Sequence, residues 1–295
     1  MTELFGVPLL ALLGQLLLGL VNGSFYALLS LGLAVIFGML NIINFAHGAF
    51  YMLGAFAAWM LLSTFGVGYF GALVLAPILV GSLGILVERL LLKRLYRLDP
   101  LYGLLLTFGL ALILEGLFRD WFGVSGETYE VPEALEGAIN LGFMVLPKYR
   151  VWVVGFSILV CLATWLIIEK TRLGSYLRAA TENPQLTQAF GVNVPLMVMM
   201  TYGFGVGLAA LAGVMAAPIF QVSPLMGSNL IIVVFAVVVI GGMGSILGAI
   251  VSGLSLGLVE GLAKVYWPEA SATVVFVIMA IVLILRPAGL LGKEQ

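Results

Sequence analysis

Apolar segments long enough to cross a lipid bilayer recur along the whole chain, and no other feature constrains the fold as strongly. A helix needs about 20 mostly apolar residues to span the hydrocarbon core, where its backbone groups must bond to one another. Charged residues make up 9% of the chain, against about 25% in an ordinary soluble domain. The sequence therefore predicts an all-α, polytopic integral membrane protein, with residues 1–295 forming a single transmembrane domain.

The number of crossings depends on two short interruptions in the apolar pattern. Only Asn22-Gly23 separates the first two candidate spans, and only GGMGS at 241–245 separates a later pair. We predict about 8–10 transmembrane helices, and our preferred interpretation is that all ten candidate spans cross separately. These spans are 7–22, 24–40, 45–64, 70–92, 103–122, 151–168, 195–217, 228–241, 245–264 and 270–286.

The distribution of basic residues predicts which face is cytoplasmic, because Lys and Arg in short loops favour that side. The loop at 123–148 contains four glutamates and the turn at 218–229 has no charge, so we expect both at the external face. Three basic groups then mark the cytoplasmic face, and the last of them places the C-terminus there. They are Arg89, Lys93, Arg94 and Arg97; Lys170, Arg172 and Arg178; and Arg286 and Lys293.

Two glycine-rich stretches stand out from the plain apolar spans. One is NIINFAHGAFYMLGAF (41–56), and the other is VVVIGGMGSILGAIVSG (237–253). Glycine inside a helix costs about 1 kcal/mol relative to alanine, and small residues in membranes mark close helix packing or breaks that face a cavity. Because the stretches lie in opposite halves of the chain, they favour an internal duplication with helices broken near the midplane.

The polar residues of these stretches are candidates for a translocation pathway. In lipid an unpaired amide or imidazole costs several kcal/mol, so these side chains should face other helices or a water-filled path. Two interpretations stay open, namely pathway lining and hydrogen bonding between helices. The candidates are Asn41, Asn44, His47, Gly48, Tyr51, Gly241, Gly242, Gly244 and Ser245.

Helical spacing groups the first stretch into two adjacent faces. We expect His47, Tyr51, Gly54 and Ala58 on one face, and Asn44, Gly48, Tyr51 and Ala55 on the next. His47 is the chain's one histidine and no carboxylate lies near it in sequence. The pattern therefore predicts no metal site and gives little support to a proton relay.

Two pairs of opposite charges lie within apolar spans, Glu115 with Arg119 and Glu260 with Lys264. Each pair has the spacing i, i+4, so its members can satisfy one another. Because both pairs lie near helix ends, where long side chains reach toward water, we interpret them as structural, with a functional role as the alternative. We assign Glu88 to the cytoplasmic boundary, with no special role.

The loop at 169–196 contains signals for a short surface helix over 184–190. Thr181 or Asn183 can cap its start, Pro184 suits its first turn, and Gly191 can end it in a left-handed conformation. On a cytoplasmic face such a helix is either a docking element for a partner or an ordinary connection.

Several kinds of chemistry lack a signature in this sequence. There is no GxxxxGK[ST] phosphate loop, no HExxH and no Ser-His-Asp grouping, so we expect a non-enzymatic chain without a cofactor. The lone Cys161 excludes a disulfide within the chain. No basic patch of the kind that binds phosphates is present, so no nucleic-acid partner is expected.

Three blocks of sequence resemble a known family. GMLNIINFAHGAFYMLGAF (38–56), TRLGSYLRAATENPQLTQAFGVNV (171–194) and GGMGSILGAIVSG (241–253) closely resemble the membrane permease of bacterial branched-chain amino-acid ABC transporters. The blocks occur in the order found in that family, and the similarity covers nearly the whole chain. The sequence looks like the shorter of its two related permease types.

The resemblance implies a permease domain in the bacterial inner membrane, working with several partners. These are a second related permease or a second copy, two cytoplasmic ABC ATPases, and an external substrate-binding protein, with lipid around the helices. The implied cargo is an amino acid, most often leucine, isoleucine or valine. Alternatives are urea or short-chain amides as cargo, or a passive channel for a small neutral solute.

In this family a loop helix of the permease seats in a groove of the ATPase. The resemblance therefore implies that 169–196 is a cytoplasmic coupling loop. The residues that match the coupling segment are Glu182, Asn183, Pro184, Gln188 and Gly191.

Overall fold

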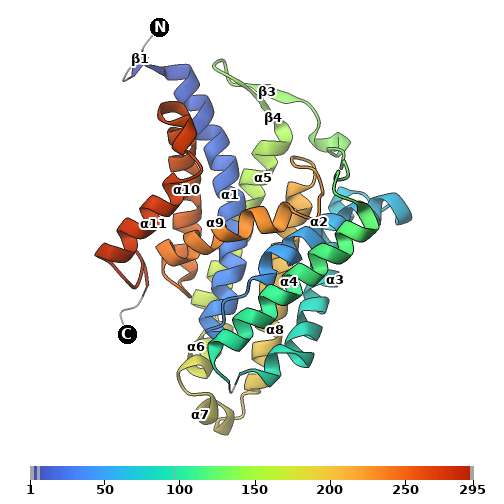
Figure 1. The fold of residues 1–295 in the computed structure, drawn as a ribbon, viewed down its shortest axis with the longest axis vertical. Helices are drawn as coiled ribbons and strands as arrows, with labels where there is room; N and C mark the ends of the chain where they lie inside the picture. The colour runs from blue at the N-terminus through green and yellow to red at the C-terminus, as the bar shows by residue number, and fades with distance from the viewer. Residues whose placement is uncertain (1–2, 5–6, 97, 293–295) are drawn as a thin grey trace. The chain divides into compact units, whose positions relative to one another are not determined.

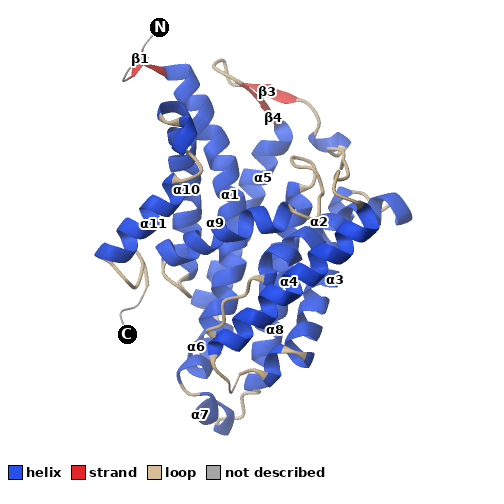
Figure 2. Cartoon of the chain, viewed as in Figure 1, coloured by secondary structure: helices blue, strands red, loops and turns tan. Residues whose placement is uncertain are grey.

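The computed structural model describes residues 3–4, 7–96 and 98–292, most of which form helices joined by loops (Figures 1 and 2). Within these residues, seven helices are long and apolar enough to cross a membrane. They are α1 (Leu9–Leu40), α2 (Ala46–Phe65), α3 (Tyr69–Leu90), α4 (Pro100–Phe122), α5 (Lys148–Lys170), α8 (Val194–Ala216) and α10 (Ile246–Tyr266). Two shorter apolar helices are α9 (Met226–Gly241) and α11 (Val274–Leu285). The predicted all-α polytopic fold is confirmed.

The remaining elements are short and lie outside these apolar helices. Helices α6 (Arg172–Glu182) and α7 (Pro184–Ala189) form the connection from α5 to α8. Short 3-10 turns are η1 (Leu92–Arg94), η2 (Glu133–Leu135) and η3 (Pro268–Ala270). Two small antiparallel hairpins pair β1 (Glu3–Leu4) with β2 (Val7–Pro8) and β3 (Ala138–Asn140) with β4 (Val145–Pro147). Arg97 and Lys293, assigned to the basic groups, lie outside the described residues.

The structure separates one predicted pair of spans and merges the other. Helix α1 runs unbroken through Asn22-Gly23, so the spans predicted at 7–22 and 24–40 are a single helix. A methyl group placed on Gly23 would lie 3.0 Å from the carbonyl oxygen of Leu254, so this glycine permits a close helix contact. The predicted break at GGMGS is confirmed, since α9 ends at Gly241 and α10 begins at Ile246.

The chain divides into two compact units, each built from segments distant in sequence. The first unit comprises residues 1–30, 131–162 and 233–295, and the second comprises 31–130 and 163–232. In the first unit, the early part of α1 packs antiparallel to α10, and Figure 1 shows these two helices side by side. Their contact is lined by glycines, because only small residues let helix backbones approach so closely. These are Gly19 and Gly23 on α1, and Gly253, Gly257 and Gly261 on α10.

In the second unit, α8 packs closely against both α2 and α3. A methyl group on Gly81 of α3 would lie 3.0 Å from the carbonyl oxygen of Gly203, and one on Gly54 of α2 would overlap the backbone of Ala210. Pro77 lies near Gly207 and Ile85 near Gly203, so α3 and α8 run antiparallel. The C-terminal end of α3 and the N-terminal end of α8 therefore lie at the same end of this unit.

Candidate functional site

The chain reverses direction between α1 and α2, in the first polar stretch. Asn41 has a φ of 52°, in the left-handed region that asparagine tolerates better than most residues. Its N–H bonds to the carbonyl oxygen of Phe37 at 2.9 Å, and residues 41–45 are not helical. Our prediction that Asn44 shares a helix face with Gly48 and Tyr51 is therefore wrong, because α2 begins only at Ala46. Asn41 itself is exposed.

Side chains from α8 and α4 hold this non-helical segment. Asn44 is 1% exposed, and its Nδ2 donates to the hydroxyl of Tyr202 at 3.1 Å. The Thr107 hydroxyl accepts from the N–H of Phe45 and donates to the carbonyl of Ile43, both at 3.2 Å. These bonds satisfy backbone groups that lipid cannot. Thr107 was not predicted from the sequence, where its only signal was a hydroxyl side chain within an apolar helix.

The remaining residues of the stretch are packed inside the second unit. The face predicted for His47, Tyr51, Gly54 and Ala58 is confirmed as a buried face of α2. His47 lies against Gly32 of α1. Gly48 approaches α9, because a methyl group on it would lie 2.7 Å from the carbonyl oxygen of Gly227. In this conformation the polar groups contact neighbouring helices, and a role in lining a pathway stays a prediction.

The second polar stretch is a tight turn between α9 and α10. Gly242 and Gly244 have φ values of 101° and 81°, a backbone conformation that favours glycine. Ser245 caps α10 by accepting from the N–H of Gly248 at 3.1 Å. Gly241 approaches the backbone of Gly248 so closely that a side chain would overlap it. The four predicted residues therefore shape one turn.

The C-terminal segment 288–292 packs on this turn, which the sequence analysis missed. The N–H groups of Leu290 and Leu291 donate to the carbonyl oxygens of Ile240 and Gly241, at 2.8 and 3.1 Å. A methyl group on Gly289 would lie 2.5 Å from the Cα of Gly242. The sequence signal for this contact was the pair of glycines in AGLLG (288–292). Movement of the turn thus requires movement of the C-terminal segment.

The two predicted ion pairs form, and one has an additional partner. Arg119 bonds Glu115 at 2.9 Å, and Lys264 bonds Glu260 at 2.6 Å. In the first unit the hydroxyl of Tyr26 on α1 also donates to Glu260, at 2.7 Å. Glu260 therefore joins α1 to α10, which agrees with the structural interpretation of this pair.

The short helix predicted in the loop 169–196 is present as α7. The Asn183 side chain caps it by accepting from the N–H of Leu186 at 2.9 Å, and Pro184 occupies its first turn. Gly191 has a φ of 86°, as expected for the end of a helix, although α7 ends at Ala189 rather than at 190. Thr181 does not cap it, because its hydroxyl donates back to the carbonyl of Leu177 within α6.

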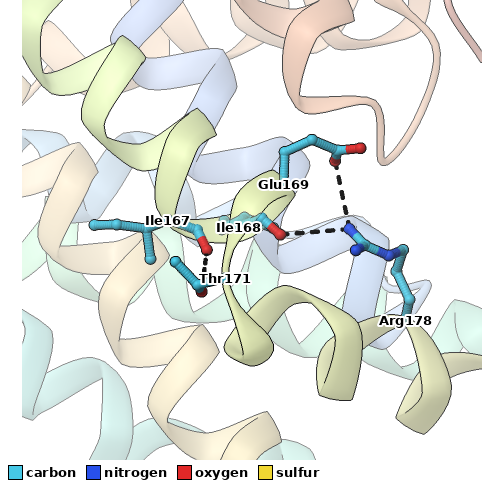
Figure 3. A network of polar contacts seen from close by, with 5 residues as sticks. All are labelled: Ile167, Ile168, Glu169, Thr171 and Arg178. Atoms are coloured by element: carbon cyan, nitrogen blue, oxygen red, sulfur yellow. Dashed lines mark hydrogen bonds and ion pairs between the residues drawn. The ribbon is translucent and has the colours of Figure 1, made fainter.

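Polar contacts hold α6 against the end of α5 (Figure 3). Arg178 bonds both the carboxylate of Glu169 and the carbonyl oxygen of Ile168, each at 3.4 Å, and Thr171 donates to the carbonyl of Ile167. A side chain on Gly174 would overlap the Ile168 carbonyl. The sharp turn into α6 therefore depends on glycine at this position.

The segment 182–191, which contains α7, is largely exposed and includes two large apolar side chains. All five predicted coupling residues are exposed, namely Glu182, Asn183, Pro184, Gln188 and Gly191. Leu186 is 55% exposed and Phe190, four residues later, is 80% exposed. Side chains at i, i+4 lie on the same side of a helix, so these two form an apolar patch. Neither residue is among those predicted from the sequence.

Comparisons with known proteins agree on one family. The family model described as branched-chain amino acid transport system / permease component matches residues 15–285. The chain is 28% identical to the high-affinity branched-chain amino acid transport system permease protein LivH of Escherichia coli, over 96% of each chain. It is 30% identical to BraD of Pseudomonas aeruginosa, again over 96% of each. Identity to the probable permease LivH of Methanocaldococcus jannaschii is 29%, over 93% of this chain and 91% of that one.

Proposed function

Since the chain belongs to the family of permease components of branched-chain amino acid transport systems, we propose that it is the transmembrane permease subunit of an ATP-driven importer. The proposed cargo is an amino acid with a branched side chain, such as leucine, isoleucine or valine. The observation that carries this proposal is the family match over residues 15–285, which includes both interrupted stretches and the loop helix α7.

The energy for transport comes from partner subunits in this proposal. The sequence has no phosphate loop of the GxxxxGK[ST] type, so two cytoplasmic ATPases would hydrolyse ATP. An external binding protein would deliver the cargo to a pair of permeases, formed with a related chain or with a second copy. The permease itself performs no chemistry on the cargo.

The loop 169–196 is the proposed coupling element, with α7 as the helix that docks into the ATPase. A capped helix keeps its shape when pushed, and an exposed phenylalanine gains stability when a partner covers it. Phe190 and Leu186 would enter an apolar groove, surrounded by the exposed polar residues Asn183 and Gln188. Closure of the ATPases on ATP would then move α6 and α7 together.

Charge distribution supports the proposed orientation in the bacterial inner membrane. The basic residues after α3 and those around the α5–α6 junction belong to the same end of the second unit, because α3 and α8 pack antiparallel. Lys and Arg gather on the cytoplasmic side of membranes. This end, with α7, is therefore assigned to the cytoplasm, and the basic C-terminal region is assigned there too. The loop 123–148 is assigned to the external face.

The two interrupted stretches are the proposed moving parts of the pathway. Breaks at 41–45 and 242–245 let helix segments reorient without unfolding, and Asn44, His47 and Tyr51 supply mildly polar groups. A zwitterionic amino acid suits such a path, which needs no buried countercharge. In the described conformation these side chains are covered, so transport would expose them.

Uptake by sealed vesicles that contain the assembled complex tests the proposal. Labelled leucine should accumulate only with ATP inside and binding protein outside, and should be unaffected by an ionophore. Uptake without ATP would instead indicate a passive channel, and collapse with an ionophore would indicate ion coupling. If urea or acetamide competes with uptake and isoleucine does not, the proposed cargo is wrong, although the proposed importer role still stands.

Substitutions in α7 test the coupling step separately. Phe190→Ser should leave the permease inserted but weaken its association with the ATPase, as should deletion of 184–190 or Gly191→Pro. Val124 in the external loop is 66% exposed, so Val124→Ser is a matched control that removes an exposed apolar side chain elsewhere. Normal co-purification of the ATPase with Phe190→Ser would contradict docking through α7.

A paired substitution tests the first interrupted stretch. Asn44→Leu with His47→Phe keeps the volume near each site but removes the polar groups. Transport should fall strongly while the complex still assembles, because the pathway loses its polar contacts. Normal uptake would mean that neither side chain is needed in the pathway or in the packing of α2.

A further inference from the structure

Glu88 is a buried carboxylate with no part in the proposed transport steps. It lies in the last turn of α3 and is 2% exposed. Among the described residues it is the only Asp, Glu, Lys or Arg that is buried, and it makes no salt bridge there. Taking a carboxylate out of water is costly unless hydrogen bonds compensate it. A position at the cytoplasmic boundary therefore does not account for the burial of Glu88, since a glutamate at the boundary could extend its carboxylate into water.

The hydroxyl of Tyr96 provides that hydrogen bond. It donates to Glu88 Oε1 at 2.6 Å, from the segment that connects η1 to α4. Tyr96 as a whole is 37% exposed, but partial burial of its hydroxyl, this bond and the charge of Glu88 raise the pKa of Tyr96 far above its usual range. The hydroxyl therefore keeps its proton and remains a donor. Leu92, between the two residues in sequence, is fully buried. The bond thus folds the turn 91–96 back onto the end of α3.

Helix α8 connects this turn to the first interrupted stretch. Gly203 of α8 packs on Ile85, one helical turn before Glu88, and Val206 packs on Gly84. Next to Gly203 is Tyr202, whose hydroxyl accepts from Asn44 at 3.1 Å. Side chains on one rigid helix move together, so a shift of α3 against α8 reaches Asn44. The Oδ1 of Asn44 has no hydrogen-bond partner among the described residues.

We propose that Glu88 and Tyr96 form a cytoplasmic latch that holds the turn 91–96 closed and thereby keeps Tyr202 and Asn44 in their present register. Glu88 is a positioning residue in this scheme, because it acts through Tyr96 rather than on the cargo. The role rests on the proposed importer, in which the ATPases would open the latch during each cycle.

Thiol labelling of the turn reports directly on the latch. Leu92→Cys in a Cys161→Ser background places one thiol at a fully buried position of the turn. In the assembled complex in lipid nanodiscs, a water-soluble maleimide should react slowly in the resting state. Adding Tyr96→Phe removes only the hydroxyl, and losing a hydrogen bond to a charged group should raise the labelling rate about tenfold or more. Tyr102→Phe, at a 54% exposed tyrosine in the first turn of α4, is the matched control.

Two further measurements separate a latch from ordinary packing. Labelling of Leu92→Cys should change during ATP turnover, and Tyr96→Phe should lower the leucine transported per ATP hydrolysed. Glu88→Gln retains an acceptor for Tyr96 and should keep labelling slow, whereas Glu88→Leu should behave like Tyr96→Phe. Equal labelling in Tyr96→Phe and the parent, or labelling that ignores nucleotide, overturns the latch while ATP-dependent uptake by the unmodified complex still stands. Absence of that uptake overturns the proposed function, and the latch with it.

Discussion

Close packing of α2 on α8 makes Gly54 a position where a single added methyl group should be strongly destabilising. A Cβ built there would overlap the carbonyl oxygen, the Cα and the carbonyl carbon of Ala210. All three are backbone atoms of a helix, so the overlap cannot be relieved by a change of side-chain rotamer. The substitution Gly54→Ala must therefore push the two helices apart, and the other contacts of α2 with α8 are lost in proportion.

The magnitude follows from two opposing effects. Alanine is favoured over glycine inside a helix by about 1 kcal/mol. Overpacking a well-packed interior costs about 1–3 kcal/mol, and a backbone clash belongs at the upper end of that range. Gly54→Ala should therefore destabilise the protein by about 2 kcal/mol. Gly116 of α4 has no atom within 4 Å of its built Cβ, so Gly116→Ala should stabilise by about 1 kcal/mol.

Thermal unfolding of the detergent-purified variants measures the difference. With about 2 °C of Tm for each kcal/mol in a large domain, the two alanine variants should differ by about 6 °C. Both substitutions have the same helix propensity change, so propensity cancels in the comparison. Equal melting temperatures would refute the close approach of α2 to α8, and with it the placement of the first polar stretch inside the second unit.

Three further outcomes test other contacts. Gly289→Val should place a branched side chain against Gly242 and displace the C-terminal segment. A cysteine introduced nearby in the α9–α10 turn should then react faster with maleimide, and unchanged reactivity would contradict the contact. Tyr26→Phe removes a hydrogen bond to the carboxylate of Glu260 and should cost about 1.5–3 kcal/mol, read as a lower Tm by the same assay. Asn183→Ala removes the cap of α7 and should cost about 1 kcal/mol of local helix stability, measured as faster amide exchange in α7; exchange at the parent rate would argue against the cap.

Local signals in the sequence predicted those features that depend on neighbours along the chain. The capped helix α7 is such a case, since Asn183, Pro184 and Gly191 act on backbone groups within a few residues. The break at GGMGS is another, because glycines with positive φ end a helix by themselves. Long apolar runs likewise predicted the seven spanning helices, but Asn22-Gly23 was misjudged as a break, and the spans predicted at 228–241 and 270–286 are the shorter helices α9 and α11.

Features that depend on distant contacts could not be predicted in this way. Glycine in an apolar helix fits a break and a close contact equally well, and at Gly23 only the presence of α10 decides between them. Glu88 looks like an ordinary boundary charge until Tyr96 bonds to it, and Phe190 looks like part of a helix core until the fold leaves it 80% exposed.

The amino-acid sequence by itself determined the family, through its three matching blocks. It also determined the class of protein and most of the spanning helices, because the bilayer tests each segment separately for hydrophobic length. Tertiary structure decided which polar groups are buried and what they bond, as with Asn44 and Tyr202, which are 158 positions apart in the chain. Inside a membrane no water competes for such groups, so their partners are chosen by how the helices pack. That packing is a property of the assembled helices and not of any one segment.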